Sequence, residues 1–417
     1  MQVSDVLWAE VDEQGRLVVP AEVAEAYGLA PGGRARIELE KDKLRLHRPV
    51  SHLAKIYVEP TNRCNIDCRT CMRHGWDTKM GKMSEQTFER LLESVAQIWP
   101  RPSVFFGGIG EPLFHPRTIE MVGRMKALGA EVELITNGTL LNEERARGLI
   151  DAGLDTLWVS IDGATSKSYA DVRLGAELPN VIENLRRFRR LRPPAHRPKP
   201  VIGIAFVAMK RNLADLPKVL ALGRSLGAKQ FMVSNLLPHT EEMAQETLYN
   251  RVLSDIAYLP SAWLPEVNLP KIEINEQTQR PFFEALNKKL NVTYAGNNFG
   301  GANDVCVFIE GGSTAVGWDG YVSPCLPLLY NHTQYLNGRR RLSKRHIVGD
   351  VGEKNLLSIW RDPEYVDYRE RVQSFAFPPC TFCGGCDLLD SNEEDCLGND
   401  FPVCGGCLWA QAVIRCP

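Results

Sequence analysis

The chain has 417 residues, of which 44% are hydrophobic and 24% are charged, and its formal net charge is -2. These values are typical of a globular protein with about three domains, which is long enough to bury its cores without disulfide staples. No segment approaches the roughly 18 consecutive apolar residues of a membrane helix, and the N-terminal residues lack the pattern of a signal peptide. We therefore expect a cytoplasmic protein with no membrane partner.

Residues 1–50 form the first expected unit, which is small and rich in β-structure. A turn and strand are predicted over 15–20, an amphipathic helix over 21–29, and two half-buried strands over 34–40 and 43–47. This order, with its Gly-Arg-Leu-Val-Val-Pro and Pro-Gly-Gly-Arg segments, resembles the AbrB/MazE-like swapped-hairpin domain. The resemblance implies a homodimer formed through this unit. Its seven Lys and Arg against nine Asp and Glu favour dimerisation or docking with no nucleic-acid partner, because phosphate binding needs a basic face.

Residues 51–257 alternate short apolar segments with amphipathic ones. Strands are predicted over 56–59, 103–106, 132–136, 156–160, 201–206 and 230–234, and helices over 84–98, 116–128, 142–152, 180–191 and 213–226. Ser84 and Asn142 are the predicted N-caps of two of these helices. Such alternation predicts an α/β fold, and six repeats fit a partial (β/α)6 barrel with its functional groups at the C-terminal ends of the strands.

Residues 258–417 are rich in loops and are expected to form a linker and a cysteine-rich α+β domain. The 12 cysteines of the chain are unevenly distributed, because three lie between residues 64 and 71 and nine follow residue 305. In a chain with no export signal, clustered thiols more often bind metal than form disulfides. The distribution therefore predicts at least two metal sites.

The first cluster is a C-x3-C-x2-C array made of Cys64, Cys68 and Cys71, directly after the first predicted strand. Three thiolates on one loop can bind three irons of a 4Fe-4S cluster and leave the fourth iron open for a substrate or cofactor. The alternative is a zinc site completed by His74.

Three further motifs follow the next three strands: Gly107-Gly-Ile-Gly-Glu-Pro112, Thr136-Asn-Gly-Thr139 and Ser160-Ile-Asp-Gly163. Together with the cysteine array they make residues 54–257 resemble the radical S-adenosylmethionine (radical SAM) superfamily. The resemblance implies that Cys64, Cys68 and Cys71 bind one 4Fe-4S cluster and that SAM chelates its open iron. Reductive cleavage of SAM would then give a 5′-deoxyadenosyl radical, which abstracts hydrogen from a substrate.

The resemblance also implies a set of SAM contacts, which are Gly108, Gly110, Glu111, Asn137, Ser160, Asp162 and Arg173. Arg suits the SAM carboxylate because its planar fork binds carboxylates through two hydrogen bonds. The alternatives are a solvated surface charge for Arg173 and a turn-stabilising side chain for Asn137.

The tail contains C-x13-G-x4-C, from Cys306 through Gly320 to Cys325, which resembles the start of a SPASM domain. This resemblance implies auxiliary iron–sulfur clusters, and we expect two 4Fe-4S clusters bound by Cys306, Cys325, Cys380, Cys383, Cys386, Cys396, Cys404, Cys407 and Cys416. Nine thiols exceed the eight that two such clusters need, so either one thiol is free or one cluster has unusual ligation. The alternative is a zinc ribbon, because Cys380-x2-Cys383 and Cys404-x2-Cys407 lie twenty residues apart.

The whole layout resembles the radical SAM/SPASM maturases of tungsten-cofactor aldehyde oxidoreductases. That resemblance implies a pterin-type cofactor or an oxidoreductase polypeptide as the substrate, and ferredoxin or flavodoxin as the electron donor. One alternative is a peptide-modifying enzyme that forms thioether or C–C cross-links or dehydrogenates Ser or Cys. Another is an AbrB-like redox-sensing regulator that is not an enzyme. No catalytic acid or base is assigned, and the polar candidates are Asp304, Asp319, Tyr321 and His239.

Overall fold

The computed structural model describes residues 8–40, 43–76, 78–196, 198–250, 273, 275–286, 292–294, 305–336, 338–378, 380–383 and 386–416. Asp304, the expected domain boundary at 257/258 and the side chain of Cys383 lie outside this described part. None of the described helices is long and apolar enough to cross a membrane.

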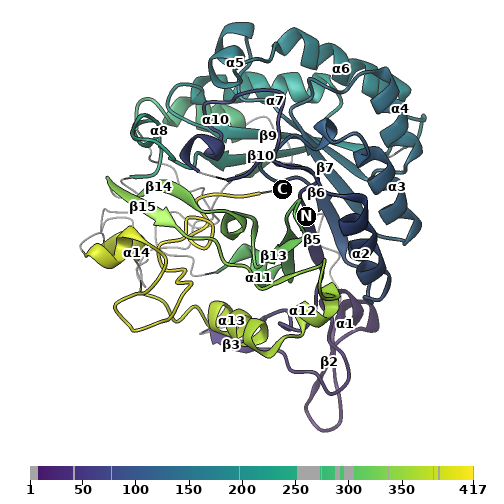
Figure 1. Cartoon of the computed structure of the whole chain (residues 1–417), viewed down its shortest axis with the longest axis vertical. Coiled ribbons are helices and arrows are strands. Elements are labelled where there is room, and N and C mark those ends of the chain that lie inside the picture. Colours follow the sequence, from purple (N-terminus) through teal and green to yellow (C-terminus); the bar gives the residue numbers. More distant parts are fainter. Residues whose placement is uncertain are drawn as a thin grey trace.

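The centre of the molecule is a curved sheet whose parallel strands follow one another in chain order (Figure 1). These strands are β5 (Lys55–Val58), β6 (Ser103–Phe106), β7 (Val132–Thr136), β8 (Thr156–Ser160), β9 (Val201–Ala208) and β10 (Gln230–Asn235). Each is in parallel register with the next, for example Val58 with Phe106 and Phe106 with Leu134. All six expected strands are therefore confirmed, and their C-terminal ends meet at one edge, where a parallel sheet collects its functional groups.

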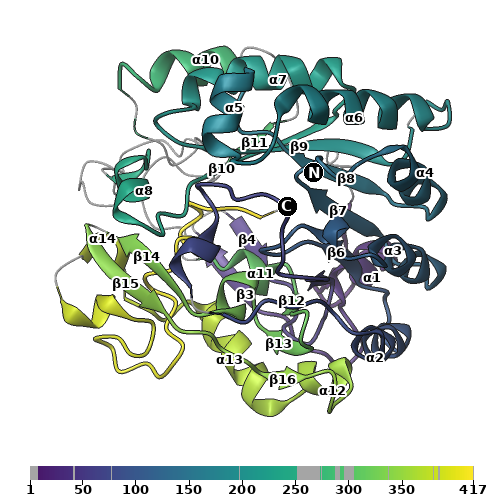
Figure 2. The same cartoon turned by 45° about the horizontal axis from the view of Figure 1, so that its top comes forward.

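Helices cover the outer face of this sheet, as Figures 1 and 2 show. Five were expected: α2 (Glu85–Ala96), α3 (Thr118–Ala127), α4 (Glu143–Asp151), α6 (Leu178–Leu191) and α7 (Leu216–Ser225), the last preceded by the 3-10 turn η3 (Leu213–Asp215). The expected caps are confirmed, since Ser84 and Asn142 accept hydrogen bonds from the first turns of α2 and α4. The short helix α5 (Ser166–Val172) was not expected, and its capping box is formed by Thr165 and Ser168.

The sheet does not end at the six strands. The strand β12 (Ser313–Val316), from the tail, pairs in parallel with β5, and β13 (Tyr321–Ser323) and β16 (Gly349–Asp350) extend it with antiparallel pairs. At the other end β11 (Val292–Tyr294) pairs in parallel with β10, which gives ten strands in all. The tail is therefore not a separate layer, because it shares one continuous sheet with the barrel.

The remaining described elements of the tail (residues 305–417) are short. They are α11 (Val307–Glu310), η5 (Leu326–Leu329), the hairpin β14 (His332–Leu336) and β15 (Arg339–Ser343), α12 (Leu356–Trp360), α13 (Pro363–Ser374), α14 (Cys380–Cys383) and η6 (Asp387–Asp390). Two further helices, α8 (Glu241–Gln245) and α10 (Gln279–Leu286), lie between the barrel and the tail in sequence.

The last described segment, residues 413–416, enters the middle of the barrel. Figures 1 and 2 both place the C-terminal end of the chain among the barrel strands. The side chain of Asn235, at the end of β10, donates a hydrogen bond to the carbonyl oxygen of Val413 at 2.8 Å. The N–H of Arg415 donates to the hydroxyl oxygen of Ser234 at 3.0 Å, so this segment is fixed against the functional edge of β10.

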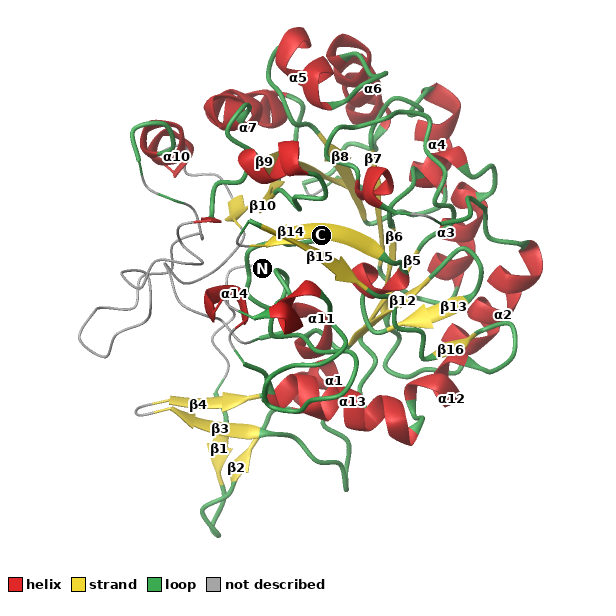
Figure 3. Cartoon of the chain, turned by 60° about the vertical axis from the view of Figure 1, so that its left-hand side comes forward, coloured by secondary structure: helices red, strands yellow, loops and turns green. Residues whose placement is uncertain are grey.

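The N-terminal unit projects from the molecule as two hairpins with a helix between them (Figure 3). The hairpins are β1 (Glu10–Val11) with β2 (Leu17–Val18) and β3 (Ile37–Glu40) with β4 (Lys43–Leu46), and the helix is α1 (Ala21–Tyr27). The expected helix and the three expected strands are confirmed, whereas β1 was not expected. His47 attaches the unit to the tail, since its Nδ1 lies 2.9 Å from a carboxylate oxygen of Glu310.

Candidate functional site

The three-cysteine loop follows β5 at the functional edge of the sheet. Its backbone is hydrogen-bonded to the end of α5, because the N–H groups of Asp67 and Arg69 donate to the carbonyl oxygens of Leu174 and Val172, both at 2.9 Å. Cys68 is buried, and Cys64 and Cys71 are half-buried. The loop is therefore held on one side by the same segment that carries Arg173.

The glycine-rich turn after β6 packs directly on this cysteine loop. A side chain at Gly110 would overlap the carbonyl oxygens of Thr61 and Arg63, so only glycine allows this close approach. The N–H of Glu111 donates to the carbonyl oxygen of Arg63 at 2.9 Å. Gly108 has a φ of 137°, which glycine adopts without the strain that other residues would suffer. The turn and the loop thus form one rigid surface.

The carboxylate of Glu111 joins this surface to the end of β7. It accepts hydrogen bonds from the hydroxyl group of Thr136 and from the N–H of Asn137, both at 2.7 Å. The side-chain amide of Asn137 in turn donates to Asn65 at 3.0 Å and faces the sulfur of Cys64 at 3.8 Å. Burial raises the pKa of Glu111, and these hydrogen bonds act in the opposite direction. Glu111 therefore acts here as a buried connector between three motifs.

Arg173 and Asp162 form a buried ion pair across the functional edge. The guanidinium lies 2.6 Å from a carboxylate oxygen of Asp162, and the exposed fractions of the two side chains are 12% and 0%. The second oxygen of Asp162 accepts a hydrogen bond from the N–H of Val207 at 2.7 Å, so β8 and β9 both fix the pair. This arrangement excludes the alternative of a solvated surface charge for Arg173. Ser160, at the end of β8, is buried close by and lines the same cavity as Arg173.

The cysteine loop has the chemistry that an iron–sulfur cluster needs. Burial raises the pKa of Cys68 to about 11, and the guanidinium of Arg173 counteracts this increase. Burial also raises the pKa of Cys64. Half-buried thiols of this kind become thiolates when metal replaces their protons. Arg73 donates a hydrogen bond to the sulfur of Cys71 at 3.0 Å, a contact of the kind that tunes bound clusters. The loop therefore offers three thiols, the ligand type that an iron–sulfur cluster takes, close to the cations Arg73 and Arg173.

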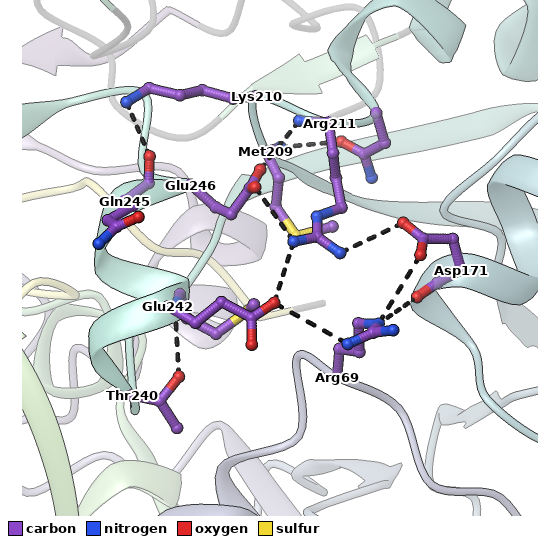
Figure 4. A network of polar contacts seen from close by, with 11 residues as sticks. Arg69, Asp171, Met209, Lys210, Arg211, Thr240, Glu242, Gln245 and Glu246 are labelled. Carbon is purple, nitrogen blue, oxygen red and sulfur yellow. Dashed lines mark hydrogen bonds and ion pairs between the residues drawn. The ribbon is translucent and has the colours of Figure 1, made fainter.

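A network of ion pairs connects the three-cysteine loop to neighbouring helices (Figure 4). Arg211 lies 3.2 Å from Asp171 of α5, 3.2 Å from Glu242 of α8 and 3.1 Å from Glu246. Arg69, next to Cys68, lies 3.8 Å from both Asp171 and Glu242. Single surface pairs contribute little to stability, but a network can fix the position of a loop. Here it ties the cysteine loop to α5 and α8.

A cavity of about 280 Å3 opens beside these motifs, inside the barrel. Cys71, Gly108, Ser160, Arg173 and Cys416 line it, so five of the expected site residues meet there. The remaining lining is mostly apolar and includes residues that the sequence did not single out, namely Phe105, Ile135, Phe206, Met232, Trp409 and Arg415. The segment that carries Trp409 and Arg415 lies far away in sequence. Cys404-x2-Cys407 and Cys416 flank it, but their spacing does not show that the segment enters the barrel.

A second group of cysteines surrounds a separate cavity of about 40 Å3 in the tail. Its members are Cys306, Cys325, Cys404 and Cys407, all of which line this cavity. Burial raises the pKa of Cys306 to about 12 and that of Cys325 well above its usual value, with the neighbouring thiols adding to the rise. Four buried or half-buried thiols around one small cavity match the number of cysteines that a 4Fe-4S cluster takes.

The other tail cysteines divide between two places. Electrostatic interaction with Cys386 and Cys396 contributes to the raised pKa of Cys380, so both cysteines lie near Cys380. Cys416 instead lines the barrel cavity, which Cys71 also lines. Spacing alone could not make this division, because it depends on contacts between distant segments.

Three of the polar candidates, Asp319, Tyr321 and His239, are not in the described lining of the barrel cavity. Burial raises the pKa of Asp319, which lies in the turn between β12 and β13. Tyr321 is exposed at the start of β13. His239 stacks on His74 with ring centroids 5.9 Å apart, in a groove between α8 and the hairpin β14–β15.

Two family models match the chain. One describes the radical SAM superfamily and matches residues 58–218, and the other describes an iron–sulfur cluster-binding domain and matches residues 306–387.

Two curated relatives are similar in sequence. The chain is 32% identical over 368 residues to the tungsten-containing aldehyde ferredoxin oxidoreductase cofactor-modifying protein of Pyrococcus furiosus, and the match covers 87% of this chain and 96% of that protein. It is 35% identical over 150 residues to the 7,8-dihydro-6-hydroxymethylpterin dimethyltransferase of Methanocaldococcus jannaschii, a match that covers 34% of this chain and 29% of that protein.

Two solved structures share the fold. Streptococcus suis SuiB bound to the precursor peptide SuiA has a TM-score of 0.54 at 15% identity, covering 83% of this chain and 72% of that chain. Native anSMEcpe with bound AdoMet has a TM-score of 0.53 at 16% identity, covering 81% of this chain and 88% of that chain.

Proposed function

The chain belongs to the radical SAM superfamily and is an enzyme, and we propose that it modifies the pterin-type cofactor of a tungsten-containing oxidoreductase. The observation that carries this proposal is the 32% identity to the Pyrococcus furiosus cofactor-modifying protein, which extends over 96% of that protein. The pterin named for the Methanocaldococcus jannaschii relative supports the same substrate class. Since the chain is an enzyme, the alternative of a non-enzymatic regulator does not hold.

Membership of this superfamily implies SAM and one 4Fe-4S cluster. We propose that Cys64, Cys68 and Cys71 bind the cluster and that Gly108, Gly110, Asn137, Ser160 and Arg173 contact SAM. When bound, the cluster supplies the electron for the reductive cleavage of SAM. Glu111 holds the glycine-rich turn against the cysteine loop, and Asp162 orients the guanidinium of Arg173 through their 2.6 Å ion pair. The lining of the barrel cavity is mostly apolar, which disfavours water beside a reactive substrate species.

For the tail, we propose two auxiliary 4Fe-4S clusters with complete cysteine ligation. The first would take Cys306, Cys325, Cys404 and Cys407, and its support is the single small cavity that these residues line. The second would take Cys380, Cys383, Cys386 and Cys396, supported by the proximity of Cys380 to Cys386 and Cys396. In this scheme Cys416 is the ninth thiol and binds neither cluster. Both sites could pass electrons between an external ferredoxin or flavodoxin and the barrel.

The proposed function is tested by producing a tungsten oxidoreductase together with this chain. The cofactor is extracted from oxidoreductase made with the wild-type chain and from oxidoreductase made with Cys71→Ala, and the two samples are compared by mass spectrometry. We expect a defined mass difference in the pterin cofactor. Identical cofactors in both samples would refute the proposal, and a mass change in the oxidoreductase polypeptide in their place would favour the peptide-modifying alternative.

We also propose that the N-terminal unit dimerises the protein. Its hairpins expose apolar side chains that a single chain leaves uncovered: the exposed fractions of Leu39, Val11 and Leu44 are 84%, 68% and 67%. Leu39 and Leu44 are paired across β3 and β4, and exposed apolar side chains that lie together favour an interaction site. Leu39→Asp should convert a dimer to a monomer in light scattering, with the exposed Glu144→Gln as control. A wild-type chain that is monomeric at all concentrations tested would contradict the dimer.

A further inference from the structure

Arg415 lies inside the barrel because its neighbours fix the tail there. The side chain of Asn235 donates to the carbonyl oxygen of Val413 at 2.8 Å, and the hydroxyl group of Ser234 accepts from the N–H of Arg415 at 3.0 Å. Both partners belong to the C-terminal end of β10. Arg415 therefore lines the same cavity as Cys71 and Arg173.

This guanidinium has no anionic partner among the described residues. Its Nε is buried and makes no hydrogen bond, and none of the described carboxylates forms an ion pair with it. The groups that interact electrostatically with this guanidinium are Cys416 and Tyr57. A thiol and a phenol are ordinarily protonated near neutral pH, so neither supplies a negative charge. Burial lowers the pKa of Arg415, because a low-dielectric surrounding disfavours the charged form. An uncompensated, partly buried cation is costly, and an anionic ligand would offset that cost.

The charged residues of the described cavity lining favour the binding of one anion. Arg173 and Arg415 are the charged members of the described lining, and it includes no Asp or Glu. Arg173 is neutralised by Asp162, whereas Arg415 is not. Among the residues that the structure describes, the lining therefore carries one positive charge without an anionic partner, on the wall that the tail contributes.

The aromatic and aliphatic side chains that line the cavity favour a ligand with a flat ring system. Phe105, Phe206 and Trp409 contribute aromatic surface, and Ile135 and Met232 contribute aliphatic surface. Trp409 is nearly buried, with an exposed fraction of 6%, so its ring is held in place. Aromatic walls favour planar heterocycles through stacking, and a guanidinium fork binds phosphate oxygens through two hydrogen bonds.

We propose that the substrate is a phosphorylated pterin and that Arg415 binds its phosphate group inside the barrel, beside the SAM site. This inference rests on the proposed function and narrows its substrate class. Arg415 acts as a specificity-determining residue: it positions the phosphate, and the apolar walls hold the ring. The C-terminal segment is thereby part of the substrate site as well as of the tail.

The test measures binding of two probes, neopterin and neopterin monophosphate, which differ only in the phosphate group. The full chain, loaded with its clusters under anaerobic conditions and saturated with SAM, is titrated with each probe and followed by pterin fluorescence. A charged hydrogen-bond pair contributes about 1.5–3 kcal/mol, so the wild-type chain should bind the monophosphate about tenfold or more tightly than neopterin. Equal dissociation constants for the two probes would overturn the inference and leave the pterin-modifying function standing.

Variants locate the effect at Arg415. Arg415→Gln should bind both probes with nearly equal affinity, whereas Arg415→Lys should keep part of the preference, because lysine retains the charge but not the planar fork. Arg147→Gln, which alters an exposed arginine of α4 paired with Glu143 at 2.7 Å, should keep the full preference. Iron content confirms that each variant is folded.

Three further outcomes would overturn the role of Arg415 or the substrate class. A full preference in Arg415→Gln would overturn the role of this residue. Binding of neither probe by the wild-type chain would overturn both the inference and the pterin part of the proposed function, while SAM cleavage by the same preparation would still show an active radical SAM enzyme. Binding of an acidic peptide in place of both probes would assign the cavity to a polypeptide substrate.

Discussion

Glu59 offers a prediction that connects burial, pH and the contact between barrel and tail. This residue follows β5 and is completely buried, yet no motif identifies it. The phenol of Tyr330, from the tail, donates a short hydrogen bond to one of its carboxylate oxygens, and the N–H of Ile109 donates to the other at 2.8 Å. We expect Glu59→Gln to fit the same space, because its amide group can donate to the Tyr330 oxygen and its carbonyl oxygen can accept from Ile109.

Burial raises the pKa of Glu59 from 4.5 to about 7, although the hydrogen bonds of Tyr330 and Ile109 oppose the rise. The folded chain therefore holds this proton more tightly than the unfolded chain, so its contribution to stability is present below pH 4.5 and is lost as the pH rises to about 7. At 1.36 kcal/mol for each pH unit, the loss amounts to about 3 kcal/mol. The glutamine cannot ionise, so Glu59→Gln should avoid this loss.

The assay compares thermal unfolding midpoints of the cluster-loaded wild-type chain and Glu59→Gln at about pH 5 and about pH 8. Both proteins carry the same clusters, so the pH dependence of cluster loss cancels in the difference. We expect the midpoint of Glu59→Gln to rise relative to wild type as the pH increases. Glu144→Gln, an exposed change on α4, is the control. A difference between Glu59→Gln and wild type that is the same at both pH values would refute the reasoning.

Three further changes test the packing of the site and the division of the cysteines. Asp162→Asn leaves the buried guanidinium of Arg173 without its partner, so the free energy of unfolding should fall by about 3–5 kcal/mol in chemical denaturation; a loss below about 1 kcal/mol would contradict the buried pair. Gly110→Ala places a methyl group against two carbonyl oxygens of the cysteine loop, so SAM binding in equilibrium dialysis should be lost, and wild-type affinity would argue against this packing. Cys416→Ala should retain about twelve irons per chain, whereas Cys404→Ala should fall to about eight; equal iron losses would disprove the proposed division.

The barrel strands and their helices could be predicted because their signals are local. The alternation of apolar strands and amphipathic helices, together with caps such as Ser84 and Asn142, depends on neighbouring residues alone. The pairing of β12 with β5 could not be predicted in this way. It joins Ser313 to Lys55 across most of the barrel sequence, and no turn or spacing specifies such a contact.

The candidate site shows the same limit. Cysteine spacing and glycine-rich turns mark the loops that hold chemistry, since each motif lies on one short segment. Spacing also places Cys380-x2-Cys383 and Cys404-x2-Cys407 in one possible zinc ribbon, whereas the fold gathers Cys404 and Cys407 with Cys306 and Cys325. Arg415 directly precedes Cys416, but that neighbour does not indicate a position in the barrel, because the place of Arg415 in the cavity depends on the tail entering the barrel.

The role of the first cysteine loop is the claim on which the proposed function and the inference about Arg415 both depend. The most direct test measures 5′-deoxyadenosine by mass spectrometry after the anaerobically prepared, reduced chain is incubated with SAM. The wild-type chain should form 5′-deoxyadenosine slowly without a substrate, and Cys64→Ala, Cys68→Ala and Cys71→Ala should each form none. Formation of 5′-deoxyadenosine by any of these three variants would contradict a cluster bound by these three cysteines.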